Sequence, residues 1–203
     1  MADIVIDHLS KAYGGRPVLR DVCLRFPAGR VSCLMAPSGA GKTTLLRILM
    51  GLEPPDAGAV RGLEGVKIAP VFQEDRLLEA LDAEANIRLV RPALAPGAVA
   101  EALHRFGLED CAGKPASALS GGMKRRVALL RALLSDGEAL MLDEPFNGLD
   151  EATRGRVIRE TLRLIDGRTA LIVTHDPGDA ALAGAAVFTL PGATSAGSGT
   201  RET

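Results

Sequence analysis

The stretch from Val31 to Met50 reads VSCLMAPSGAGKTTLLRILM. Its first five residues, Val31 to Met35, form an apolar run that is typical of a buried strand. The residues from Ala36 to Thr44, APSGAGKTT, form a glycine-rich loop. From Lys42 to Met50 the apolar residues recur at helical spacing, and a glycine followed by a Pro-Pro pair ends the segment. The order strand, loop, helix is the one that a phosphate-binding loop requires.

The phosphate loop, Ala36 to Thr44, offers the groups that a nucleoside triphosphate and Mg²⁺ need. Backbone N–H groups can surround the β- and γ-phosphates, Lys42 can reach the same oxygens, and the Thr43 hydroxyl can ligate Mg²⁺. A glycine-rich turn without a ligand is the alternative, and the flanking strand and helix disfavour it. The candidate phosphate-binding residues are Ser38, Gly39, Ala40, Gly41, Lys42, Thr43 and Thr44, the last near the α-phosphate.

The first position of the loop departs from the usual pattern, because Ala36 stands where a glycine is usual. Alanine is acceptable if the residue keeps a negative φ, but it costs about 1–2 kcal/mol if the loop needs a left-handed conformation there. We expect nucleotide binding to survive this substitution.

A second segment, Ala139 to Pro145, reads ALMLDEP and places two adjacent carboxylates at the end of an apolar strand. The alternation of strands and helices puts this strand end beside the phosphate loop. Asp143 can hold Mg²⁺ through a coordinated water, whereas Glu144 projects the opposite way and can polarise the water that attacks the γ-phosphate. Asp-Glu pairs are also common in surface turns, but the phosphate loop favours the catalytic interpretation here.

A third segment, Leu119 to Met123, reads LSGGM and precedes a helix that we predict over Met123 to Leu134. Ser120 can cap this helix, and Gly121 and Gly122 let backbone amides approach an anion. An ordinary helix cap is the alternative. The basic start KRR, followed by VALLRALL, favours the anion-binding interpretation.

The rest of the chain has the pattern of one α/β unit. With 203 residues and 47% hydrophobic composition it can bury a single sizeable core. Alternating strands and helices favour a mainly parallel sheet. Further strands are predicted at Ile4–Asp7, Val18–Phe26, Val66–Phe72 and Ala170–Val173, and helical periodicity runs over Leu77–Leu108 and Glu151–Ile165.

These patterns give the expected domain boundaries. We expect a single domain over residues 1–190, with a helical subdomain inserted at about 75–135, and a disordered tail at 191–203. The uncharged stretch from Ala180 to Thr200 contains proline, glycine, serine and threonine, which disfavour a bilayer span. It is interpreted as a short alanine-rich helix, a strand and then the tail.

Composition excludes several classes of function. The formal net charge is -1, from 24 basic and 25 acidic residues, so no basic patch favours nucleic acid or an anionic membrane surface. The three cysteines, Cys23, Cys33 and Cys111, lack the spacing of a metal site and are expected to be reduced thiols. The first residues have early acids and no extended apolar core, which is not the pattern of a secretory signal.

These ordered motifs resemble those of the ATP-binding-cassette (ABC) family over about Ile4 to Leu190. The resemblance implies an α/β P-loop NTPase of the ABC type, whose mainly parallel sheet carries an N-terminal antiparallel β portion and an inserted helical subdomain. In that family two ATPase subunits pair head to tail, and two ATP molecules lie between the phosphate loop of one and the LSGG segment of the other. ATP and Mg²⁺ are therefore the implied ligands.

The resemblance also implies roles for four further residues. Tyr13, in SKAYGG, would stack on adenine, and Gln73, in VFQED, would sense Mg²⁺ and the attacking water. Asp150, in FNGLD, would cross the dimer interface and link the two ATP sites. His175, in VTHD, would contact the γ-phosphate and orient the nucleophile.

Within the family, VFQEDRLL and LSGGMKRRVALLRALL resemble importer ATPases of the nitrate, sulfonate and taurine group. This implies import of a small organic or oxyanion nutrient, at the cytoplasmic face of the cell membrane. The implied partners are a second ATPase subunit, integral membrane permease subunits and an extracytoplasmic solute-binding protein, without nucleic acid. Those importers often continue with Pro-Trp where Glu79-Ala80 stands here, in the region expected to receive the membrane subunit.

Three alternatives stay open at this point. An exporter subunit would carry the same motifs. A chromosome-maintenance or DNA-repair ATPase would need a long coiled coil or a DNA-binding domain, but the roughly hundred residues between Lys42 and Asp143 contain no heptads. A hydrolytically weak scaffold module is disfavoured because Glu144, Gln73 and His175 are all present.

Overall fold

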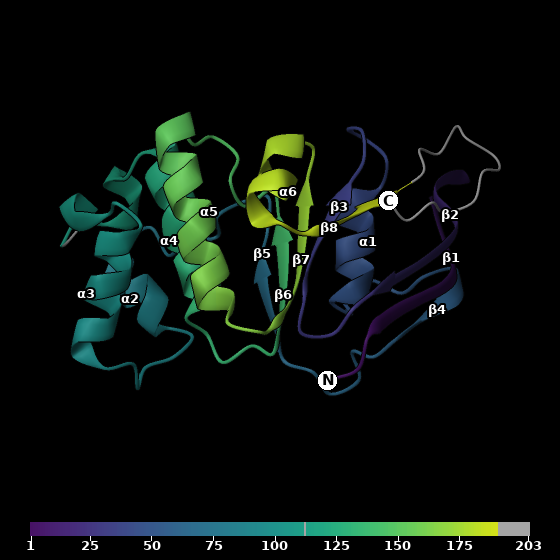
Figure 1. Ribbon diagram of the computed structural model, residues 1–203, viewed down its shortest axis with the longest axis horizontal. Coiled ribbons are helices and arrows are strands. Elements are labelled where there is room, and N and C mark those ends of the chain that lie inside the picture. Colours follow the sequence, from purple (N-terminus) through teal and green to yellow (C-terminus); the bar gives the residue numbers. More distant parts are fainter. Residues whose placement is uncertain (112, 191–203) are drawn as a thin grey trace.

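The computed structural model describes residues 1–111 and 113–190, so the tail expected at 191–203 lies outside the described residues. Two sheets and a group of helices make up the molecule (Figure 1). The strands are β1 (Ile4–Tyr13), β2 (Arg16–Phe26), β3 (Val31–Met35), β4 (Ala57–Arg61), β5 (Ile68–Val71), β6 (Ala139–Asp143), β7 (Thr169–Thr174) and β8 (Ala186–Thr189). The helices are α1 (Lys42–Leu49), α2 (Ala83–Arg88), α3 (Pro96–Arg105), α4 (Gly121–Leu133), α5 (Glu151–Ile165) and α6 (Pro177–Ala183), with 3₁₀ turns η1 (Glu109–Cys111) and η2 (Ala116–Ala118).

The larger sheet has five parallel strands in the order β5-β6-β7-β3-β8, and the smaller sheet is antiparallel in the order β2-β1-β4. The predicted fold class, a mainly parallel core with an N-terminal antiparallel portion, is confirmed. Strand β7 lies between β3 and β6, so the strand that carries the two carboxylates is not the immediate neighbour of the phosphate-loop strand. Both strands still end at the same edge, because all strands of this sheet run parallel.

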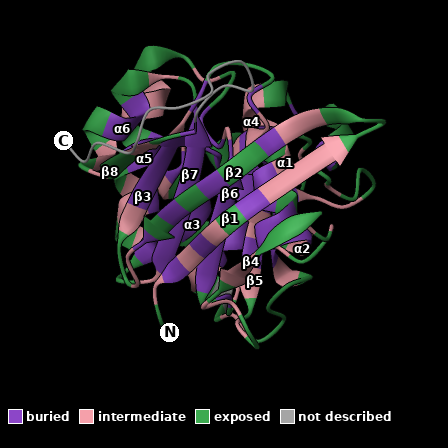
Figure 2. Cartoon of the chain, turned by 90° about the vertical axis from the view of Figure 1, so that its right-hand side faces the viewer, coloured by how far each residue is buried: buried purple, intermediate pink, exposed green. Residues whose placement is uncertain are grey.

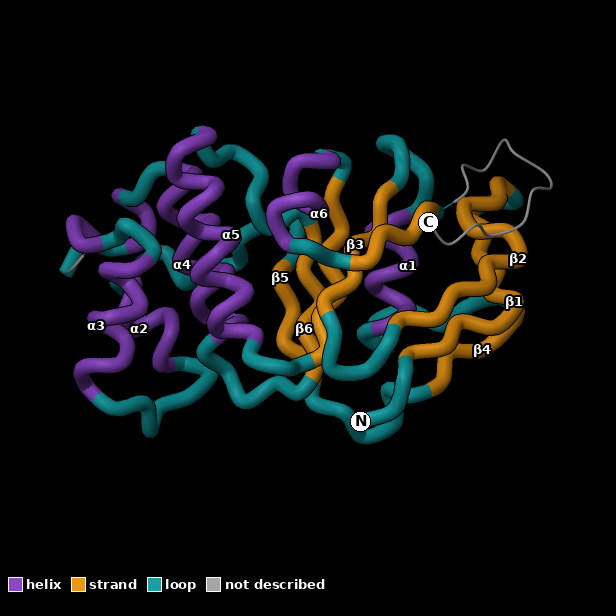
Figure 3. The backbone as a smooth tube through the Cα atoms, viewed as in Figure 1, coloured by secondary structure: helices purple, strands orange, loops and turns teal. Residues whose placement is uncertain are grey.

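Two apolar cores lie on opposite faces of the parallel sheet, and strand β6 contributes to both. Met141 packs in the core that α1 and the antiparallel sheet share, whereas Leu140 and Leu142 pack in the core under α4 and α5. Helix α1 lies between the two sheets (Figures 1 and 3). Strands β6 and β7 inside the parallel sheet are buried along their whole length (Figure 2), which explains their continuous apolar sequences.

The antiparallel sheet differs most from the sequence prediction. Strand β1 continues to Tyr13, past the predicted end at Asp7, although polar residues interrupt its apolar pattern and its pairing with β2 shifts register at three places. Strand β4 was not predicted, because its sequence AGAVR has little β propensity. Gly58 in β4 has φ +82, and a Cβ atom there would lie 2.3 Å from the His8 carbonyl oxygen, so only glycine fits.

The helical segment was predicted as periodic from Leu77 to Leu108, but it holds two separate helices, α2 and α3. Prolines between and at the start of these helices prevent one continuous helix. The buried Asn86 amide instead orders the turn before α2, since it donates to the carbonyls of Leu78, Leu81 and Asp82. Helix α6 and strand β8 match the expected alanine-rich helix and strand near the end of the described chain.

Candidate nucleotide site

The phosphate loop joins the end of β3 to the start of α1. Gly39 and Gly41 have φ values of +79 and +91, which only glycine adopts without strain. Gly41 is also the N-cap of α1 and provides no side-chain cap, so the first N–H groups of the helix face the loop without a side-chain acceptor. The loop therefore presents oriented backbone N–H donors at a helix N-terminus, which is a binding site for phosphate.

Ala36 has the negative φ that a residue with a Cβ atom requires. The five non-glycine residues with positive φ in the described chain are His8, Asp21, Arg76, Glu144 and Asp166, so Ala36 keeps a negative φ. Its carbonyl accepts a hydrogen bond of 2.6 Å from Lys42 Nζ, which also donates to the Pro37 carbonyl at 3.2 Å. The lysine ammonium thus lies over the loop, where phosphate oxygens would compete with these carbonyls.

Thr43 and Asp143 form the candidate Mg²⁺ site. The Thr43 hydroxyl donates to Asp143 Oδ2 at 2.9 Å. Burial raises the pKa of the Asp143 carboxyl, while the Thr43 hydrogen bond lowers it. Gln73 joins both residues in the lining of a cavity of about 80 Å³. Thr43 offers a hydroxyl oxygen, Asp143 a buried carboxylate and Gln73 an amide oxygen. Mg²⁺ prefers oxygen ligands of these kinds, so the residues present fit the ion.

Glu144 and His175 form the second pair at this sheet edge. His175 Nδ1 lies 2.9 Å from Glu144 Oε1, and the imidazole is largely exposed. Glu144 has φ +48, a left-handed conformation, and its N–H donates to the Val173 carbonyl at 2.9 Å. This turn sends the Glu144 side chain to His175, whereas Asp143 faces Thr43. The two adjacent carboxylates therefore have different partners, as the sequence pattern predicts.

The LSGG segment begins α4 two residues earlier than predicted. Gly121 and Gly122 form the first turn of the helix instead of preceding it, and the Ser120 side chain caps it by accepting from the Met123 N–H at 3.3 Å. A Cβ atom on Gly122 would lie 3.3 Å from the Gly148 carbonyl oxygen, so this first turn packs on the loop before α5.

Asp150 ends that loop as the N-cap of α5. Its carboxylate accepts from the Thr153 N–H at 2.9 Å, and this hydrogen bond lowers the pKa of Asp150. Asp150, Ser120 and Gly121 are all exposed. Within residues 1–111 and 113–190, no hydrogen bond or ion pair joins positions 36–44 to positions 119–123. Within the LSGG segment Ser120 and Gly121 are therefore exposed, whereas Leu119 is buried and Gly122 is half-buried.

Tyr13 lies at the end of β1 with 44% of its surface exposed. The pKa of its phenol is raised, chiefly by the Glu53 carboxylate, while Thr44 lowers it. Lys11 Nζ lies 5.7 Å from the ring centroid. The exposed Tyr13 side chain therefore lies near Thr44, the last residue of the phosphate loop.

Arg125 is the main feature of the site that sequence reasoning missed. It lies in α4, is 5% exposed, and donates to the carbonyls of both Asp143 and Glu144. In the sequence it is one of three consecutive basic residues, Lys124 to Arg126, and nothing in that run distinguishes it. Its burial follows from the tertiary packing of α4 on the sheet edge, which no local pattern reveals.

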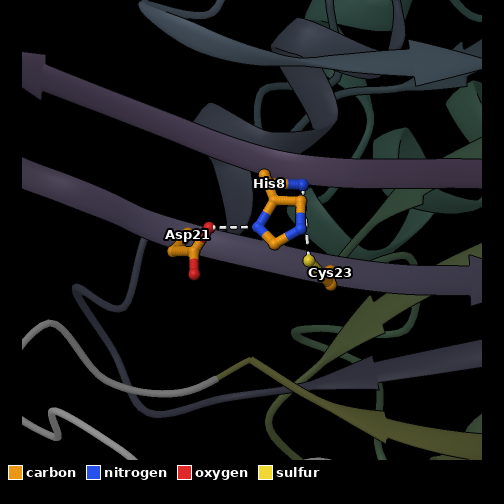
Figure 4. Close-up of side chains that lie close together, drawn as sticks. All are labelled: His8, Asp21 and Cys23. Carbon is orange, nitrogen blue, oxygen red and sulfur yellow. Dashed lines mark hydrogen bonds and ion pairs between the residues drawn. The ribbon is translucent and has the colours of Figure 1, made fainter.

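A separate cluster on the antiparallel sheet does not belong to this site. His8, Asp21 and Cys23 place one ligand atom each within 4.8 Å of one another (Figure 4), and no other such group of three occurs in the described part of the chain. His8 Nδ1 lies 2.6 Å from Asp21 Oδ1. Mg²⁺ prefers oxygen ligands, so an imidazole and a thiol do not make an alternative magnesium site.

Comparison with known proteins decides the family. A family model described as ABC transporter matches residues 19–147, which hold the phosphate loop, the LSGG segment and both carboxylates. The chain belongs to the ATP-binding-cassette family. ABC cassettes are ATPases that bind ATP with Mg²⁺, and this chain is one of them. No helix in the described residues is both long and apolar enough to cross a membrane.

The most similar ABC proteins include two kinds of importer subunit. The chain is 42% identical to the Fe(3+) ions import ATP-binding protein FbpC of Streptomyces coelicolor, over 83% of its own length and 53% of the relative's. It is also 42% identical to the aliphatic sulfonates import ATP-binding protein SsuB 1 of Pseudomonas savastanoi pv. phaseolicola, over 84% and 73% of the two chains. The chain thus spans about half of the FbpC relative and about three quarters of the SsuB relative.

A solved structure with the same fold is that of the ATP-binding cassette MJ0796, in a dimeric post-hydrolysis state bound to ADP and Pi. It superposes with a TM-score of 0.80 at 28% sequence identity, over 92% of this chain and 94% of that one. A second dimeric structure of MJ0796, described as a bacterial ABC transporter cassette, gives a TM-score of 0.78.

Proposed function

We propose that this chain is the ATP-hydrolysing subunit of a membrane importer, which pairs with a second ATPase subunit when ATP binds. The observation that carries the proposal is the convergence at one sheet edge of two pairs, Thr43 with Asp143 and Glu144 with His175. The two pairs beside a phosphate loop support a metal site and a general base. The importer relatives support the coupling to transport.

The phosphate loop binds and orients the nucleotide. The backbone N–H groups from Ser38 to Thr43, including those of Gly39, Ala40 and Gly41, surround the β- and γ-phosphates, and Lys42 exchanges its loop carbonyls for phosphate oxygens. Thr44 lies near the α-phosphate, and Tyr13 stacks on the adenine. Thr43, Gln73 and Asp143 would hold Mg²⁺. In that place the ion would supply positive charge that offsets the charge of the phosphates during transfer.

Glu144 acts on the attacking water. Its carboxylate accepts a hydrogen bond from that water, which aligns the oxygen lone pair with the γ-phosphorus and raises its nucleophilicity. His175 Nδ1 lies 2.9 Å from Glu144 Oε1 and fixes the orientation of the carboxylate, and the doubly protonated imidazole can also donate from Nε2 to the γ-phosphate. The carboxylate and the imidazole therefore act as one unit.

A second ATPase subunit completes each site. Ser120, Gly121 and Gly122 present a capped helix start that is exposed on the surface of this chain, and the backbone N–H groups of that start bind the γ-phosphate held by the other subunit. Asp150 lies in the loop that packs on Gly122 and crosses the interface between the two sites. ATP thus closes the dimer, and hydrolysis opens it.

Closure moves permease subunits between inward- and outward-facing states. The chain acts at the cytoplasmic face of the membrane, bound peripherally through these permease subunits, and an extracytoplasmic solute-binding protein delivers the cargo. We infer that the cargo is a small organic or oxyanion nutrient, and the sulfonate-import name of one relative supports this. The importer names of the relatives support this direction of transport over export, and no comparison favours a chromosome-maintenance ATPase.

The test is to identify what the chain binds when its dimer is held closed. A tagged Glu144→Gln variant is expressed in its native cell, the membranes are solubilised with Mg-ATP, and the co-purifying proteins are identified. Recovery of a polytopic membrane protein together with a solute-binding protein is the expected result. A permease alone would favour export, and soluble DNA-associated partners would overturn the transport proposal.

A further inference from the structure

The guanidinium of Arg125 joins three parts of the molecule that are remote in sequence. Arg125 lies on α4, one helical turn after Gly121 of the LSGG segment. Nη1 donates to the Phe72 carbonyl at 2.5 Å, to the Gln73 carbonyl at 3.4 Å and to Asp75 Oδ1 at 3.1 Å. Nη2 donates to the carbonyls of Glu144, at 2.8 Å, and of Asp143.

These contacts use nearly all the donor capacity of the side chain. Arginine has five N–H donors in a fixed planar fork, and here Nε also donates, to the Glu144 carbonyl at 3.2 Å. The acceptors are four backbone carbonyls and one carboxylate. A planar fork of fixed geometry holds these acceptors at fixed separations, which the flexible point charge of a lysine does not. Arg125 therefore sets the distance between residues 72–75, the segment that contains Gln73, and the end of β6.

Glu144 needs such support because of its backbone conformation. Its φ of +48 is unfavourable for a residue with a Cβ atom, and such strain persists only where the surroundings hold it. Four partners hold Glu144: its N–H donates to Val173, its carbonyl accepts from Arg125 and from the Asn147 N–H, and its carboxylate contacts His175. Of these four partners in the described residues, Arg125 alone also forms a hydrogen bond to Gln73.

The Gln73 segment needs support for a different reason. Residues 72–80 between β5 and α2 contain neither helix nor strand, so no sheet or helix hydrogen bonds fix them. Arg125 holds the first part of this segment, and Arg131, one and a half turns further along α4, donates to the carbonyls of Asp75 and Arg76. Two arginines of α4, Arg125 and Arg131, thus anchor the segment that carries Gln73.

We propose that Arg125 is a positioning residue for ATP hydrolysis, which fixes Glu144 and Gln73 relative to each other and to the LSGG helix. The inference rests on the catalytic roles proposed above for Glu144 and Gln73. Arg125 touches neither substrate nor metal, and it acts through the backbone of the two residues. A displacement of the LSGG helix, as when a second subunit docks on it, is transmitted by this side chain to both.

Arg168 provides a matched control. Its guanidinium is also partly buried and donates to four backbone carbonyls, but these belong to Leu133, Gly137, Leu164 and Ile165, none of which lies in the nucleotide site. The substitutions Arg125→Gln, Arg125→Lys, Arg168→Gln and Arg168→Lys therefore remove comparable hydrogen bonds. A merely structural role for Arg125 would make the two pairs of variants behave alike.

The experiment measures kcat and KM for Mg-ATP and the melting temperature of the full chain and its variants. We expect Arg125→Gln to lower kcat by about tenfold or more with KM within about twofold, and Arg125→Lys to recover part of that loss. The Arg168 variants should lose melting temperature but keep kcat within about twofold of the parent chain. Equal kcat for Arg125→Gln and Arg168→Gln would overturn the inference.

Two further variants keep the test decisive. If Arg125→Gln does not fold, Asp75→Ala removes one anchor of the guanidinium and is expected to lower kcat several-fold without changing KM; an unchanged kcat would reject the positioning role. Glu144→Gln is measured in parallel. Parental turnover in Glu144→Gln would refute the proposed catalytic base itself, whereas loss of turnover there, together with normal turnover in Arg125→Gln, would refute this inference alone.

Discussion

The Thr43 hydroxyl lies 2.9 Å from the Asp143 carboxylate, although the two residues are 100 positions apart in the chain. The parallel sheet makes this contact, because β3 and β6 end at the same edge and α1 begins directly over it. Such an edge is where open α/β sheets bind their ligands. Burial of Asp143 there keeps water away from the carboxylate, so its charge is available to a metal ion.

That burial predicts a trade between stability and function at Asp143. Because the folded-state pKa of Asp143 is raised, its ionised form destabilises the fold at pH values above that pKa, and the penalty disappears as the pH falls through it. Asp143→Asn keeps an oxygen for Thr43 but removes the charge. In differential scanning calorimetry at neutral pH without nucleotide, we expect this variant to melt a few degrees above the parent chain. A gain of roughly 1 kcal/mol in the free energy of unfolding has an effect of this size.

The same variant should lose the stabilisation that Mg-ATP gives to the parent chain over ATP with a chelator. Without nucleotide, the difference in melting temperature between Asp143→Asn and the parent chain should also shrink as the buffer is made acidic. A variant that melts below the parent at neutral pH would show that the Asp143 charge is compensated in the fold.

His175 should affect turnover more than binding. Because its imidazole contacts the Glu144 carboxylate, His175→Ala leaves the phosphate loop intact and frees the carboxylate to rotate. We expect kcat to fall by about 10²-fold or more and nucleotide affinity to stay within about twofold, as measured by steady-state hydrolysis and by calorimetric titration. Hydrolysis at the parental rate would remove His175 from the mechanism.

Ala36→Gly should change ATP affinity little. The residue has a negative φ, so the alanine carries no left-handed penalty that a glycine would relieve. The added freedom of glycine in the unfolded chain lowers stability by about 0.4–1 kcal/mol. Calorimetric titration with Mg-ATP and a thermal melt check the two expectations, and sharply tighter binding by the glycine variant would contradict the first.

Asp150 allows its structural and interface roles to be separated. Asp150→Asn keeps a side-chain oxygen for the Thr153 N–H, so the α5 cap and the melting temperature should change little near neutral pH. If Asp150 crosses the interface, the substitution should reduce ATP-dependent dimerisation when combined with Glu144→Gln, as seen by analytical ultracentrifugation. Undiminished dimerisation of the double variant would limit Asp150 to capping.

The sequence predicted the parts of this site that local chemistry determines. The glycines of the phosphate loop, the apolar run before Asp143 and the capping serine at position 120 are each readable from neighbouring residues, because turns, buried strands and helix caps have short-range causes. Strand β4 could not be predicted, because its small residues are held by pairing with β1. Arg125 could not be predicted either, since its burial depends on where α4 packs.

The start of α4 was placed two residues late for a related reason. Gly121 and Gly122 have poor helix propensity, but the Ser120 cap and the contact of Gly122 with Gly148 hold them in the first turn. Tertiary contact here outweighs intrinsic preference. The adenine contact of Tyr13 and the interface role of Asp150 came from family resemblance, because both depend on molecules outside this chain.

The most direct test of the account is to measure Mg-ATP binding and hydrolysis together for Glu144→Gln. The amide keeps the size of the side chain and its contact with His175 but cannot act as a base. We predict parental affinity for Mg-ATP, turnover reduced by about 10²-fold or more, and a dimer that persists during gel filtration in Mg-ATP. Hydrolysis at the parental rate by this variant would contradict the assignment of Glu144, and with it the mechanism.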